Sequence, residues 1–262
     1  MHTITAPDGT TIAYDRTGAG EPVVLVGGAF SYRRFPGQVK LAQLLSARFT
    51  VYSYDRRGRG DSGDTQPFTP EKEYADLAAV AAAAGPRPPF VFGHSSGAAI
   101  ALRAAAAGLP VAGIVAYEAP FGNEDSPRPP VDPADHIRQL VSSGRNGEAV
   151  EFWMAEVVRA PHDVLAQMDG APWVRALEPL APTLPYDIAV TAGGVPTAEL
   201  GKIAAPVLFL GGRNSPGWFQ RSVAEQAGAT PGARLQMLDG YDHNAPPEVI
   251  TPLLIDFFGV AR

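Results

Sequence analysis

The chain has 262 residues, 45% of them hydrophobic and 18% charged, which is enough apolar material to bury the core of one large α/β domain. Its formal net charge is −6 and its lysines and arginines are spread along the chain, which argues against nucleic acid or an anionic membrane as the main partner. It contains no cysteine, and this excludes disulfides, thiol chemistry and cysteine-ligated metal sites.

The first residues, "MHTITAPDGTTIAYD", alternate apolar and polar side chains and lack the charged-then-apolar order of a signal peptide. No apolar run approaches the length that spans a bilayer, so we expect a cytoplasmic protein without a membrane partner. The segments "HTITA" and "TIAYDRT" flank the turn signal Pro7-Asp8-Gly9. This pattern predicts an opening antiparallel hairpin.

Short, unbroken, β-rich runs recur along the rest of the chain, as is typical of strands buried on both faces of a parallel sheet. Helical stretches lie between these runs, and the alternation predicts βαβ units. The expected fold class is therefore α/β, with a mainly parallel eight-stranded sheet flanked by helices. After the hairpin, the predicted strands cover 22–28, 49–55, 89–95, 113–119, 206–212 and 233–240. The predicted helices between them cover 37–47, 70–84, 96–107, 217–227 and 247–258.

One region interrupts the alternation of strand and helix. After "GIVAYEAP" the segment "FGNEDSPRPPVDPAD" is rich in proline and acids, which indicates a linker. From about 133 to 200 the pattern is helical and contains no convincing buried strand. We therefore predict a helical cap at 120–200, inserted between the two parts of the sheet domain, 1–119 and 201–262.

The segment "GHSSG" at 93–97 is a G-x-S-x-G match placed between an apolar strand and an alanine-rich helix. Strand, tight turn and helix are the context that a nucleophile elbow requires, so Ser95 is the predicted nucleophile. The alternative is that Ser95 only caps the helix. His94 is its immediate neighbour on a sharp turn and should point away from it, so we expect His94 to line the pocket.

The predicted general base is His243. Of the five histidines, His2 is terminal and His136 and His162 lie in the predicted cap. His243 lies in "LDGYDHNAPPEVI", after the last predicted strand and before the last predicted helix. Loops at the carboxyl ends of strands are where open α/β sheets build their sites.

By its sequence motifs, the chain resembles the α/β-hydrolase fold superfamily over nearly its whole length. The matching segments are "VVLVGGAFS", "YDRRGRGDSG", "GHSSG" and "GYDHNAPPEVI". The resemblance implies that "DRRGRGDSG" mainly shapes a turn, so that Arg56, Arg57 and Asp61 are structural. It also implies that the backbone N–H groups of Ala29 and Ser96 hold the oxyanion.

The resemblance places the triad acid near Asn214 in "GGRNSPGW", where this chain has no carboxylate. Some members of the superfamily, among them certain haloalkane dehalogenases, take the acid from the strand that follows the elbow helix. Glu118 occupies that position and is our predicted acid. A dyad assisted by Asn214, or another aspartate such as Asp239 or Asp242, remains open.

These placements predict a serine hydrolase that acts on an ester, lactone or amide of a small to medium apolar substrate through an acyl-enzyme. No metal or organic cofactor is implied, and the protein is expected to be a monomer or homodimer. A slow-turnover ligand-binding protein, or a natural-product cyclase or carbon–carbon hydrolase, would keep the same fold. The predicted substrate pocket consists of Phe30, His94, Phe121, Trp153 and Trp218.

Overall fold

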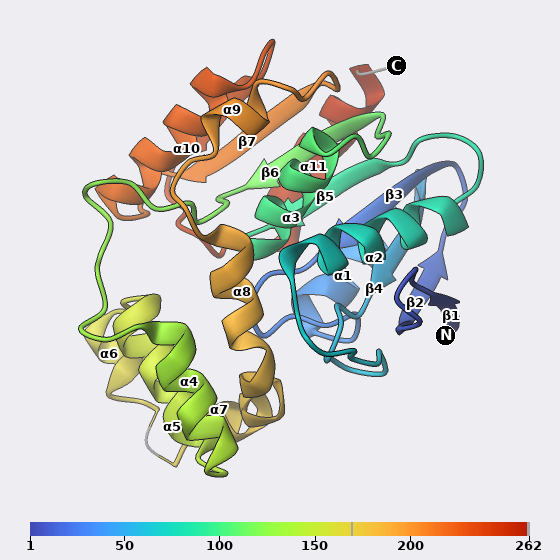
Figure 1. The fold of residues 1–262 in the computed structure, drawn as a ribbon. Helices are drawn as coiled ribbons and strands as arrows, with labels where there is room; N and C mark the ends of the chain where they lie inside the picture. The colour runs from blue at the N-terminus through green and yellow to red at the C-terminus, as the bar shows by residue number, and fades with distance from the viewer. Residues whose placement is uncertain (169, 261–262) are drawn as a thin grey trace.

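The computed structural model describes residues 1–168 and 170–260 and confirms a mainly parallel eight-stranded sheet with helices on both faces (Figure 1). The strand order is β1-β2-β4-β3-β5-β6-β7-β8. β1 pairs antiparallel with β2, and β2 with β4, whereas all later pairs are parallel. The strands are β1 His2–Thr5, β2 Thr11–Thr17, β3 Glu21–Val26, β4 Phe49–Tyr54, β5 Phe90–His94, β6 Gly113–Tyr117, β7 Val207–Gly212 and β8 Arg234–Leu238.

The central strands are buried on both faces, which explains their continuous apolar runs. β8 is mostly exposed at the edge of the sheet, so its sequence pattern is weaker. The predicted hairpin is confirmed as β1 and β2, joined by a turn in which Gly9 adopts a φ of 86° that favours glycine.

Two helical layers cover the sheet. On one face α2, α3 and α10 pack over the strands, with the alanines of α3 allowing a close approach. On the other face α1 and α11 pack together. These helices are α1 Pro36–Leu45, α2 Pro70–Ala83, α3 Ser96–Ala106, α10 Gly217–Ala229 and α11 Pro247–Val260.

The chain between β6 and β7 is helical throughout its regular elements and has an apolar cluster of its own. In Figure 1, α4 to α7 lie at the lower left of the sheet, and α8 (gold) stands between them and the sheet. The boundaries of a separate cap at 120–200 stay a prediction. The elements are α4 Pro133–Ser142, α5 Asn146–Phe152, a π-helical turn Trp153–Val157, α6 His162–Leu165, α7 Pro172–Leu177, a 3-10 turn Glu178–Thr183, α8 Leu184–Thr191 and α9 Thr197–Leu200.

Among the described residues, no helix combines the length and the apolar character needed to cross a membrane.

Candidate active site

Ser95 lies on a sharp turn between β5 and α3. Its φ of 56° is in the left-handed region, where a side chain other than glycine is strained. Gly93 and Gly97 make the turn possible: a Cβ on Gly93 would lie 2.5 Å from the Cα of Ala98, and one on Gly97 would overlap the carbonyl oxygen of Val26. The Ser95 N–H donates to the Tyr117 carbonyl at 2.9 Å, which ties the turn to the end of β6.

The predicted base and acid lie together. His243 Nδ1 is 2.7 Å from Glu118 Oε2, and Glu118 is fully buried. The other carboxylate oxygen accepts the Gly212 N–H at 2.7 Å, which fixes the orientation of the carboxylate. Because a carboxylate only accepts, the ring hydrogen of His243 belongs on Nδ1, and Nε2 keeps a free lone pair.

The carboxylate that contacts His243 comes from the end of β6, and the His243 loop covers the end of β7. A Cβ on Gly212 would lie 2.5 Å from the Tyr241 carbonyl oxygen and 2.6 Å from the Asp242 Cα. Asn214 is exposed and holds this loop through its backbone, with its N–H donating to the Tyr241 carbonyl at 2.9 Å. The end of β7 therefore supports the loop by backbone contacts, and a carboxylate reaches His243 from β6.

The carboxylates of the two alternative aspartates contact residues other than His243. Asp239 is exposed and pairs with Arg213 at 2.6 Å. Asp242 is exposed, and its carboxylate accepts the Asn244 N–H at 2.9 Å. Neither carboxylate orients the His243 ring in this arrangement.

His94 and Tyr117 hold the backbone of the His243 loop. His94 Nε2 donates to the His243 carbonyl at 2.9 Å. The Tyr117 hydroxyl donates to the Asp242 carbonyl and accepts the Ala245 N–H at 3.2 Å. Burial, together with the nearby His243, lowers the pKa of His94 to about 3, so His94 is neutral near pH 7. Tyr117 is a contributor that the sequence analysis missed, although it directly precedes Glu118.

The predicted oxyanion donors lie beside Ser95. A Cβ on Gly28 would lie 2.7 Å from the Ser95 Cβ and 3.3 Å from its Oγ, so the Gly28–Ala29 peptide passes directly against the serine. This close approach explains the glycine at that position. Within the described part of the chain, the Ala29 and Ser96 N–H groups have no backbone acceptor.

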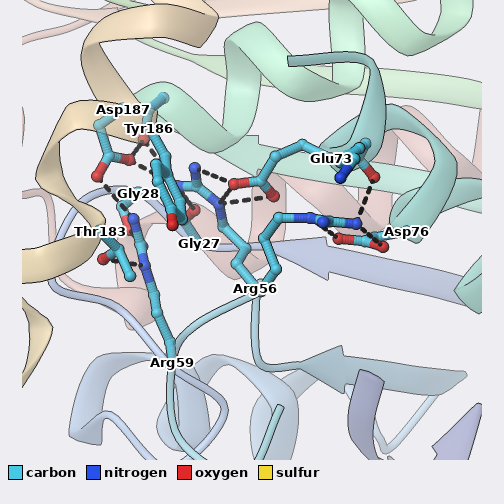
Figure 2. Close-up of polar contacts among 12 residues, drawn as sticks. Gly27, Gly28, Arg56, Arg59, Glu73, Asp76, Thr183, Tyr186 and Asp187 are labelled. Atoms are coloured by element: carbon cyan, nitrogen blue, oxygen red, sulfur yellow. Dashed lines mark hydrogen bonds and ion pairs between the residues drawn. The ribbon is translucent and has the colours of Figure 1, made fainter. Parts of the chain in front are cut away.

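The charged side chains of the turn after β4 form two groups that have different partners. Arg57 pairs with Asp76 at 2.8 Å and Asp61 with Arg33 at 2.5 Å, both away from Ser95, in keeping with a structural role. Arg56 instead reaches Ser96 Oγ at 3.1 Å. Figure 2 shows it among further buried partners.

Two members of this buried group, Arg59 and Asp187, were missed by the sequence analysis. Three arginines within the four residues 56–59, directly after a buried strand, were the available signal for Arg59. Asp187 lies in a helix far along the chain and had no comparable signal.

The predicted pocket residues separate in the structure. Phe30 meets Trp153 edge-on, with ring centroids 6.2 Å apart, within the apolar cluster of the helices between β6 and β7. Phe121 has no exposed surface and packs with the core beside α3 and α10. Core packing is therefore enough to explain an aromatic residue at this position. Trp218 is half-buried and stacks on Phe219, whose ring centroid is 5.2 Å from that of His243.

A cavity of about 290 Å³ adjoins His243 on the side of α1 and α11. Its walls are mostly apolar, and Ala29 and His94 also line it. A buried amide nitrogen, Gln38 Nε2, belongs to a lining residue and has no partner among the described residues. The apolar lining includes Phe35, Leu41, Phe92, Tyr117, Ala245 and Ile250.

Comparison with known proteins agrees with this architecture. A family model described as "Alpha/beta hydrolase family" matches residues 23–249. The crystal structure of an alpha/beta hydrolase from Sphaerobacter thermophilus superposes with a TM-score of 0.91 at 46% identity, covering 98% of this chain and 100% of that one. The esterase RhEst1 from Rhodococcus sp. ECU1013 superposes with a TM-score of 0.76 at 21% identity, covering 100% and 99% of the two chains. At this identity it shows the shared fold alone.

A Mycobacterium tuberculosis protein that carries the name of a non-heme bromoperoxidase, BpoC, is 33% identical over 90 residues. The matched stretch spans about a third of the length of this relative, 34%, and 34% of the present chain.

Proposed function

The chain is a hydrolase of the alpha/beta hydrolase family, and we propose that it cleaves an ester-like bond of a small to medium apolar substrate through an acyl-enzyme on Ser95. The observation that carries this proposal is the 2.7 Å contact between His243 Nδ1 and the buried Glu118 carboxylate, together with the strained elbow at Ser95. A buried carboxylate behind a histidine is the arrangement that stabilises an imidazolium during acyl transfer.

The reaction begins when Nε2 of His243 removes the proton of Ser95 Oγ as the oxygen attacks the substrate carbonyl. Glu118 stabilises the positive charge that develops on the imidazole. The Ala29 and Ser96 N–H groups bind the oxygen of the tetrahedral intermediate. His243 then gives its proton to the leaving group, and the same residues activate water to hydrolyse the acyl-enzyme.

The surroundings favour an apolar substrate. The cavity beside His243 has mainly apolar walls, and its volume of about 290 Å³ suits a short alkyl chain or a single ring. The substrate class is therefore an ester, lactone or amide with a small apolar group that fits this cavity.

The proposal is tested by the hydrolysis of p-nitrophenyl acetate and butyrate by the wild type, Ser95→Ala and His243→Gln. Loss of either residue is expected to lower kcat by about three or more powers of ten, because the serine and its base act as a unit. Mass spectrometry should find an acyl or fluorophosphonate adduct on Ser95 and on no other serine.

The matched control is His162→Gln, which changes a histidine of α6 and should keep wild-type rates. Equal rates for wild type and Ser95→Ala would contradict the proposal, and they would point to a protein that binds ligands without turnover.

A further inference from the structure

Four charged side chains lie beneath the loop that carries Gly28 and Ala29, which we call the oxyanion loop, and they have almost no exposure to solvent. Arg56 and Arg59 are each 1% exposed, Glu73 is 0% and Asp187 is 2%. We call these four residues the buried charge cluster (Figure 2). Burying ions is costly even when they pair, and apolar residues of similar size often stabilise a fold more. A contribution to the stability of the fold is therefore a weak explanation for the burial of these four charges.

Arg59 holds the peptide that carries one proposed oxyanion donor. Its Nη1 donates to the Gly28 carbonyl at 2.6 Å, and the Ser31 N–H donates to the same oxygen at 3.2 Å. In a trans peptide the carbonyl and the following N–H point in opposite directions. Holding the Gly28 oxygen toward Arg59 therefore turns the Ala29 N–H away from the buried charge cluster.

Arg59 also acts on the strength of this donor. A positive charge at the carbonyl end of a peptide polarises the group and makes its N–H a stronger hydrogen-bond donor. In a site shielded from water this effect is larger than in solution. The Ala29 N–H is thus oriented and strengthened from behind by the same guanidinium.

The second proposed donor belongs to Ser96, whose side chain is held by the same cluster. Ser96 Oγ donates to Asp187 Oδ1 at 2.6 Å and accepts from Arg56 Nη1 at 3.1 Å. These two contacts fix the first residue of α3. The direction of the Ser96 N–H follows, because its side chain and its peptide share one Cα.

Asp187 connects the two halves of the cluster. Its Oδ1 accepts from Arg56 Nη1 at 2.7 Å and its Oδ2 from Arg59 Nη2 at 2.6 Å. Burial by itself would raise the pKa of Asp187, but Arg59, Arg56 and the Ser96 hydroxyl outweigh it and lower the pKa below its usual value. Asp187 is therefore ionised, and one carboxylate restrains both arginines and Ser96.

Asp187 comes from α8, between β6 and β7, whereas its partners belong to the sheet domain. Arg59 Nε adds a second contact to this part of the chain, with Thr183 Oγ1 at 3.0 Å. Figure 2 shows Arg59 extending between Thr183, Gly28 and Asp187.

We propose that Asp187 is a positioning residue for the oxyanion hole, acting on the Ala29 donor through Arg59 and on the Ser96 donor directly. Helix α8 then contributes a positioning residue to the catalytic centre, in addition to any role in covering the substrate. This inference rests on the proposed function, because it assigns the two N–H groups to the oxyanion.

The test compares Asp187→Asn with Asp76→Asn, using butyrate ester hydrolysis in the intact protein. Asp76 is an equally buried carboxylate, and among the described residues both of its oxygens accept hydrogen bonds from Arg57 and none from the buried charge cluster. Active sites are counted by fluorophosphonate labelling of Ser95, so that kcat refers to correctly folded enzyme. Binding of a trifluoromethyl ketone, whose adduct with Ser95 carries an oxyanion, is measured alongside.

In Asp187→Asn we expect kcat per labelled site to fall about 10- to 100-fold, less than the loss of a whole oxyanion donor, while KM changes by no more than about threefold. Affinity for the trifluoromethyl ketone should fall by the same factor as kcat/KM. Asp76→Asn should lower thermal stability and leave both quantities near the wild type. Equal kcat per site in the two variants would overturn the inference.

If Asp187→Asn does not fold, the inference can still be tested with Ser96→Ala and Arg59→Lys. Ser96→Ala retains the backbone N–H and loses only the side-chain contacts, so about a severalfold loss in kcat is expected. Arg59→Lys keeps the charge and loses the simultaneous contacts to Gly28, Asp187 and Thr183. Wild-type kcat in both variants would overturn the inference, whereas a wild type no faster than Ser95→Ala would instead overturn the proposed function.

Discussion

The two halves of the candidate active site are held in position by different parts of the chain. The His243 loop is held from the sheet, by His94 at the end of β5 and by Tyr117 and Glu118 at the end of β6. The proposed oxyanion side, which carries Gly28, Ala29 and Ser96, contacts the buried charge cluster, whose central carboxylate, Asp187, comes from α8.

The difference teaches how each half depends on the rest of the fold. His94 and Tyr117 are neighbours in the β5–β6 register, so their positions are set by a parallel pair in the middle of the sheet. Asp187 reaches its partners only when α8 packs against the sheet domain. A displacement of α8 should therefore disturb the oxyanion side and leave the His243 loop in place.

The largest effect is expected from Glu118→Gln, which removes the one charged contact that His243 makes among the described residues. An amide cannot stabilise the imidazolium and can reverse the ring tautomer, so kcat should fall by about 10² to 10⁴. Rates are measured on p-nitrophenyl butyrate, with Asn214→Ala as the control at the exposed position after β7. Similar rates in both variants would contradict the assignment of Glu118.

A smaller effect is expected from Tyr117→Phe, which keeps the ring and removes the hydroxyl contacts to Asp242 and Ala245. Two backbone groups of the loop lose a partner, so the free energy of unfolding should fall by about 1–3 kcal/mol and kcat by about tenfold. Urea unfolding and steady-state kinetics give the two values. Tyr52→Phe, a buried tyrosine of β4, is the control, and equal kcat in the two variants would argue against a role for Tyr117 in holding the loop.

The smallest effect on activity is expected from His94→Gln, whose amide can still donate to the His243 carbonyl. The pKa of His94 is about 3 in the folded protein, against an ordinary value of 6.5. Below pH 6.5 the unfolded chain therefore binds a proton that the folded protein does not. His94 stabilises the fold above this pH and loses that contribution as the pH falls toward 3, with a slope of up to about 1.4 kcal/mol per pH unit.

Urea unfolding of wild type and His94→Gln between pH 7 and pH 4 measures this contribution. The wild type should lose stability more steeply than the variant as the pH falls. Parallel curves would show that His94 takes up a proton as readily in the folded protein as in the unfolded chain.

Much of the fold could be predicted because its signals are local. The buried strands show as continuous apolar runs, and the edge strand β8 shows a weaker one because most of it is exposed. The elbow was recognisable because a tight turn needs glycine at fixed spacing around Ser95. The carboxylate that contacts His243 was harder to predict, since its position relates to how the His243 loop lies over Gly212.

The sequence by itself determined the order of strands and helices, the elbow at Ser95 and the histidine after the last strand, because each rests on neighbouring residues and their spacing. Only the tertiary structure decided which carboxylate meets His243 and which residues hold the oxyanion loop. Asp187 is 131 residues from Arg56 and 91 from Ser96 along the chain. Helix and strand periods relate only residues that are close along the chain. Residues this far apart meet only because α8 packs against the sheet.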